Sequence, residues 1–68
     1  MKNVIINPGS RDVIKDAEEL FGKERVQGGI YRDPVKVINL SDIEANEAKE
    51  YFESLNKRVE VIDIPEKD

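Results

Sequence analysis

The residues best placed to do chemistry in this sequence lie at 7–12, Asn-Pro-Gly-Ser-Arg-Asp, where an apolar stretch ends and a helical pattern begins. A helix N-terminus offers free backbone amides, and here Gly9, Ser10 and Arg11 would add a hydroxyl and a guanidinium for an anion. Asp12 competes for the same positive end, and neither glycine-rich phosphate-binding pattern is present. The stretch therefore predicts a helix start and, at most, a weak anion site at Gly9, Ser10 and Arg11.

A second group of polar residues lies along a later helical pattern. Asp42, Glu47, Glu50 and Glu53 fall on its expected solvent side, with Glu53 placed to pair with Lys57 four residues on. Such a face could meet a basic partner surface, although an ordinary solvated helix face has the same pattern.

Residue types exclude several kinds of active site. The chain has no His and no Cys, so a His-based triad, a Cys nucleophile, a Cys/His zinc site and disulfides are all impossible. No pair of carboxylates is forced together in an apolar setting, as acid and base catalysis would need. The sequence therefore predicts no catalytic residue, no metal site and no cofactor.

The elements that must position these groups alternate between strand and helix patterns. Apolar runs predict strands over 3–7, 35–40 and 58–64, helical stripes predict helices over 11–21 and 42–55, and residues 65–68 form a charged tail. Residues 25–31 are ambiguous, since Val26, Ile30 and Tyr31 favour a short edge strand that Gly28 and Gly29 interrupt.

Local signals define both helices. Ser10 is the expected N-cap of the first and Gly22 its C-terminal residue, while Ser41 and Glu44 have the spacing of a capping box for the second. The apolar stripes predict the buried faces. Their residues are Val13, Ile14, Ala17, Leu20 and Phe21 in the first helix, and Ala45, Ala48, Phe52 and Leu55, flanked by Ile43 and Tyr51, in the second.

This order predicts a single α+β domain over residues 1–68. It is a β-α-(β)-β-α-β two-layer sandwich with two helices on one face of a sheet of three or four strands. A real strand at 25–31 gives a ferredoxin-like arrangement, and a loop there gives a more parallel three-stranded sheet. Because 68 residues bury a small core and the edge near Val26–Tyr31 is unprotected, we expect a homo-oligomer.

The distribution of charge and the first apolar run limit the classes of partner and the compartment that we expect. Residues 1–34 hold 6 basic and 6 acidic side chains and residues 35–68 hold 5 and 9, so the net charge of −4 comes from the second half. Without a Lys/Arg cluster, nucleic acid is a poor partner. The first apolar run is too short for a signal peptide or a membrane span, and the absence of Cys suits a reducing cytoplasm.

Two stretches that cover about half of the chain, 7–20 and 35–55, resemble the core of SepF, a cell-division protein family that helps link FtsZ to the membrane. The matching residues are Pro8, Ser10, Val37, Asn39, Leu40, Ile43, Glu44, Ala48, Lys49 and Leu55. The resemblance implies a SepF-like fold and a homodimeric, non-catalytic scaffold that binds another protein, FtsZ in that family.

A second, local resemblance supplies the alternative function. Residues 25–32, Arg-Val-Gln-Gly-Gly-Ile-Tyr-Arg, are similar to the acylphosphatase signature, and Val37–Asp42 is similar to that family's later strand. The resemblance implies a small phosphate-handling enzyme in which Arg32 clamps phosphate and Asn39 orients the attacking water. In that family a helix separates the two motifs, whereas here a turn and a strand do.

Overall fold

The computed structural model describes residues 1–28 and 33–65, and within them two α-helices and four strands. The elements are β1 (Lys2–Asn7), α1 (Arg11–Phe21), a short 3-10 helix (Lys23–Arg25), β2 (Val26–Gly28), β3 (Val35–Leu40), α2 (Asp42–Ser54) and β4 (Arg58–Asp63). The predicted tail at 65–68 lies outside the described residues except for Pro65.

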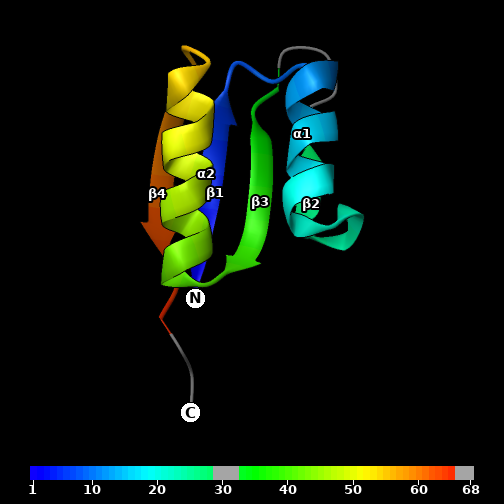
Figure 1. Cartoon of the computed structure of the whole chain (residues 1–68). Coiled ribbons are helices and arrows are strands. Elements are labelled where there is room, and N and C mark those ends of the chain that lie inside the picture. Colours follow the sequence, from blue (N-terminus) through cyan, green and yellow to red (C-terminus); the bar gives the residue numbers. More distant parts are fainter. Residues whose placement is uncertain (29–32, 66–68) are drawn as a thin grey trace.

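The strands form one antiparallel sheet in the order β2-β3-β1-β4 (Figure 1). The predicted α+β class is therefore confirmed, and the order is that of the ferredoxin-like split β-α-β arrangement. The more parallel three-stranded alternative is wrong, because Val26–Gly28 pairs with β3 as an edge strand. The rest of that predicted strand, residues 29–31, lies outside the described residues.

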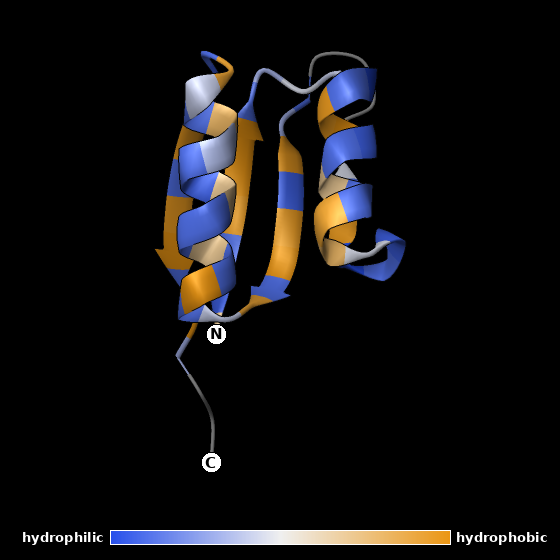
Figure 2. Ribbon diagram, in the orientation of Figure 1, coloured by the Kyte–Doolittle hydropathy of each residue, from blue (hydrophilic) through white to orange (hydrophobic). Residues whose placement is uncertain are grey.

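Both helices pack on the same side of the sheet (Figure 1). α1 lies against β2 and β3, and α2 against β1 and β4. One core cluster joins the two helices to alternate residues of the central strands, and Figure 2 shows the apolar strands behind largely hydrophilic outer helix surfaces. The buried residues are Val4, Ile6, Val13, Ala17, Phe21, Val35, Val37, Leu40, Ala45, Ala48 and Phe52.

A β-bulge interrupts the pairing of the two central strands. Lys2 faces Leu40 and Val4 faces Val37, so two residues, Ile38 and Asn39, oppose Asn3 alone. Asn39 has a φ of 58°, and its backbone N–H donates to Asn3 Oδ1 at 3.3 Å. Simple alternation would put Asn39 on the core face with Val35 and Val37. The extra residue puts Leu40 there instead.

The predicted helix caps are confirmed. Ser10 Oγ accepts from the Val13 N–H at 3.3 Å, and Gly22 ends α1 with a φ of 98°. Ser41 and Glu44 form both bonds of the capping box, at 3.2 and 3.1 Å.

Four of the residues expected on or beside the buried stripes are exposed, and Tyr51, at 40%, is one of them. Leu55 is 45% exposed because α2 ends at Ser54, so this residue leaves the helical stripe. Leu20 is 50% exposed and lies at the rim of the α1 stripe, whereas Ile43, at 73%, lies in the first turn of α2 and points away from the sheet. The two helices therefore expose several apolar side chains to solvent.

Candidate functional site

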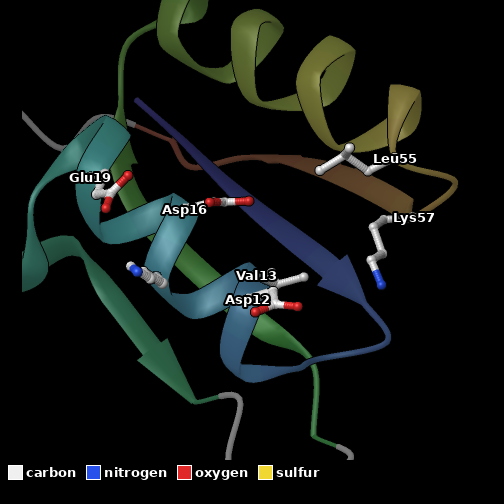
Figure 3. A pocket seen from close by; sticks show the side chains of 7 residues that line it. Asp12, Val13, Asp16, Glu19, Leu55 and Lys57 are labelled. Carbon is white, nitrogen blue, oxygen red and sulfur yellow. The ribbon is translucent and has the colours of Figure 1, made fainter.

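One hollow lies between α1 and the turn that follows α2. It has a volume of about 530 Å³ and is lined by Asp12, Val13, Lys15, Asp16, Glu19, Leu55 and Lys57. Figure 3 shows the α1 carboxylates on one side of it, with Leu55 and Lys57 on the other. The α1 residues are four or three apart, which places them on one side of the helix.

A second hollow lies between the same two helices. It has a volume of about 380 Å³ and is lined by Leu20, Phe21, Glu47, Glu50 and Tyr51. Leu20 and Tyr51 are 50% and 40% exposed, so its wall offers apolar surface to solvent. We name the two hollows together the inter-helix groove.

One hydrogen bond links the two helices across the groove. The Tyr51 hydroxyl donates to Asp16 Oδ2 at 3.2 Å, and the Tyr51 ring stands edge-on to Phe52 with centroids 5.0 Å apart. Burial and the negative charges of Asp16 and Glu19 raise the pKa of Tyr51. Tyr51 therefore stays a neutral donor and joins the polar groove wall to the core.

The inter-helix groove is acidic with apolar patches. Five carboxylates line it, Asp12, Asp16, Glu19, Glu47 and Glu50, against the two cations Lys15 and Lys57. Carboxylates around exposed Leu and Tyr side chains are complementary to a basic segment with an apolar anchor.

The predicted acidic group on α2 is divided between two places. Glu47 and Glu50 line the groove. Asp42 lies at the other end of the helix, 3.8 Å from the Lys2 ammonium, and Glu53 lines neither hollow. The structure thus brings only two of the four carboxylates into the groove.

The predicted pair of Glu53 and Lys57 does not form within the described residues. The reason is local, because α2 ends at Ser54 and Asn56 has a φ of 64°, which turns the chain out of the helix. Lys57 then lies in the larger hollow, opposite the carboxylates of α1 (Figure 3).

At the start of α1 the predicted anion site is occupied in part by the protein itself. Ser10 Oγ bonds the Val13 amide, and exposed Arg11 begins the helix. Weak anion binding at Gly9, Ser10 and Arg11 stays a prediction.

The two residues of the acylphosphatase alternative cannot be compared as a pair. Arg32 lies outside the described residues. Asn39 holds the bulge between β1 and β3, and its positive φ explains why an Asn stands there. This backbone role accounts for Asn39 without a substrate.

An ion pair missed by the sequence analysis braces α2. Arg25 Nη1 lies 2.8 Å from Glu44 Oε2, and both side chains are about one-third exposed. The hydrogen bond from the Ser41 N–H, helped by Arg25, lowers the pKa of Glu44. Residues 19 apart in sequence meet here, which no local pattern could indicate.

The described residues contain no cluster of His, Cys, Asp or Glu side chains arranged to hold a metal ion. None of the described helices combines the length and apolar character needed to cross a bilayer. Comparison with protein-family models, curated proteins and solved structures found no match for this chain.

Proposed function

We propose that this chain is a non-catalytic protein-interaction module that self-associates and binds a partner protein in its inter-helix groove. The observation that carries the proposal is the groove itself, where Leu20, Tyr51 and Leu55 are exposed among carboxylates from both helices. Exposed apolar side chains within a rim of mainly negative charge are typical of a surface that another protein covers.

The partner chemistry follows from the charge of the groove. Glu47 and Glu50 on one helix and Asp16 and Glu19 on the other favour Lys and Arg, and the apolar side chains between them favour a Leu, Ile or aromatic anchor. The resemblance to SepF adds FtsZ as the first partner to test and the cytoplasm as the compartment. The composition, net charge −4 without a basic cluster, argues against nucleic acid.

A direct binding assay tests this proposal. Purified FtsZ is titrated into labelled protein, and fluorescence anisotropy is measured for wild type, Glu50→Lys and Glu53→Lys. Both substitutions reverse the same charge on exposed positions of α2, but only Glu50 lines the groove. We expect Glu50→Lys to weaken binding about tenfold more than Glu53→Lys.

Equal effects of the two variants would place the partner elsewhere and overturn the groove assignment. Absence of binding at about 100 µM FtsZ, a millimolar-range affinity or weaker, would remove FtsZ as the partner.

A further inference from the structure

No described element covers the sheet face opposite the helices (Figure 1). Side chains alternate along a strand, so the residues between buried Val4 and Ile6, and between Val35 and Val37, point to this face. We name it the open sheet face. Its residues are Asn3, Ile5, Asn7, Gln27, Lys36, Ile38, Arg58, Glu60 and Ile62.

The open sheet face carries a negative side chain on one side of β1 and a positive side chain on the other. Ile5 lies at the centre of β1, and its two cross-strand partners are Glu60 on β4 and Lys36 on β3. Both charged side chains are exposed, and neither forms a salt bridge with another of the described residues. A carboxylate and an ammonium group thus flank the central Ile5, one on each side.

Apolar residues occupy the next level along the strands. Ile62 on β4 is the partner of Asn3, and Ile38 lies on the other side of Asn3, at the bulge in β3. Ile62 is 39% exposed and Ile38 is half-buried. At the level of Ile5, β4 therefore carries Glu60 and β3 carries Lys36. At the level of Asn3, β4 carries Ile62 and β3 carries Ile38.

We propose that a second copy of this chain covers the open sheet face, related to the first by a two-fold axis that runs along β1 through Ile5. This axis exchanges the two sides of the face and keeps the level, so Glu60 lies over Lys36 of the second copy and Ile62 over its Ile38. The Ile5 side chains of the two copies meet on the axis. The inference rests on the self-association in the proposed function and names the surface that provides it.

The other face-to-face arrangement has its two-fold axis across the strands. That axis returns each strand onto itself, so Glu60 would face Glu60 and Lys36 would face Lys36, which is repulsive. The charges on the central level therefore select the axis along β1.

The twist of the two sheets does not move Glu60 of one copy out of contact distance of Lys36 of the other. Aligned sheets cross at about 30°, so side chains about 5 Å from the axis shift by about 2.5 Å relative to their partners. Lys and Glu side chains span that shift easily. With the axis on β1, the strands β3, β1 and β4 of the two copies overlap, and the short edge strand β2 extends beyond the second copy. Three strands about 4.8 Å apart and six residues long give about 300 Å² of sheet per copy, below the area of a standard protein interface, so we expect a weak dimer.

The test compares charge reversals with their combination. Sedimentation equilibrium from about 10 µM to 1 mM measures the dissociation constant of wild type, Lys36→Glu, Glu60→Lys and the double variant. Each single reversal replaces two attractive pairs by two repulsive ones and is expected to weaken the dimer about tenfold. The double variant restores opposite charges and is expected to return within about threefold of wild type.

The design separates local pairing from net charge. Glu60→Lys makes the acidic chain less negative, so a general charge effect would strengthen association, whereas the proposal requires weakening. Lys49→Glu, on the exposed side of α2, is the matched control for Lys36→Glu and is expected to leave the dimer unchanged. Circular dichroism confirms that each variant is folded.

Three results would overturn the inference: a monomeric wild type at 1 mM, single reversals without effect on an existing dimer, or a double variant as weak as the singles. A dimer that ignores both reversals would point to edge pairing and leave self-association standing. The comparison of Glu50→Lys and Glu53→Lys tests the partner groove independently of all three results.

Discussion

Replacing Phe52 tests the packing of α2 on the sheet. Phe52 is fully buried in a cluster to which both helices and the central strands contribute, so truncation to Ala leaves a cavity that none of these neighbours can fill easily. Such a change costs about 3–5 kcal/mol. A domain of 68 residues has about 3–10 kcal/mol of stability in total. Phe52→Ala should therefore unfold much of the population.

Phe52→Leu gives a variant that stays measurable. It keeps part of the side-chain volume and is expected to cost about 1–2 kcal/mol. With a slope of about 1 kcal/mol per M for so small a chain, the urea midpoint should fall by about 1–2 M. Circular dichroism at 222 nm follows the helices directly.

The control is Leu55→Ala, one turn further along the chain. Leu55 is nearly half exposed and caps α2, so its truncation removes little buried area and should cost less than about 1 kcal/mol. Equal urea midpoints for Phe52→Leu and Leu55→Ala would refute the assignment of the buried face of α2.

Further predictions concern the caps, the bulge and the absence of catalysis. Ser41→Ala removes one bond of the capping box and should lower stability by about 1 kcal/mol in the same urea assay, less than Phe52→Ala. Because the pKa of Glu44 is lowered, its ionised form adds stability that is fully present above the ordinary pKa of 4.5. This added stability is lost as the pH falls through the lower pKa of the folded state. The difference in urea midpoint between wild type and Glu44→Gln should therefore be largest near pH 7 and shrink on acidification. At the bulge, where φ is 58°, Asn39→Gly should melt close to wild type in a thermal scan and Asn39→Val well below it. Hydrolysis of an acyl phosphate should stay at background in wild type and in Arg32→Ala alike; activity that Arg32→Ala abolishes with the fold intact would contradict the non-catalytic proposal.

Local signals in the sequence were sufficient for the helices and for the order of the elements. Ser10, Gly22 and the Ser41–Glu44 pair act through bonds within three or four residues, so their spacing predicts their structure. The strands were equally clear wherever β-branched residues ran together. Local patterns misplaced Leu55, because the helix ends one residue earlier than its apolar spacing suggests.

Features that depend on pairing between distant segments could not be predicted. The bulge at Asn39 exists only in the register of β3 against β1, so alternation along the strand gave the wrong face. The inter-helix groove requires Tyr51 to meet Asp16, 35 residues earlier, and the sequence gives no measure of how the two helices lie together. The sequence therefore indicated Glu47 and Glu50 by their charge, but it could not show that they line the groove while Glu53 does not.

The pairing of β1 with β4 also decides how the domain would respond to mechanical force. Lys2 faces Asp63, with 3.2 Å between ammonium and carboxylate, and the Ile64 N–H donates to the Met1 carbonyl at 3.0 Å, so segments attached at either side would leave from the same end of the sheet (Figure 1). The bonds between antiparallel strands lie across the strands, and tension on two adjacent ends loads them one rung at a time. Stretched in an optical trap, the protein would open as a zipper from Lys2 towards Asn7, at low force, because no step breaks several rungs together.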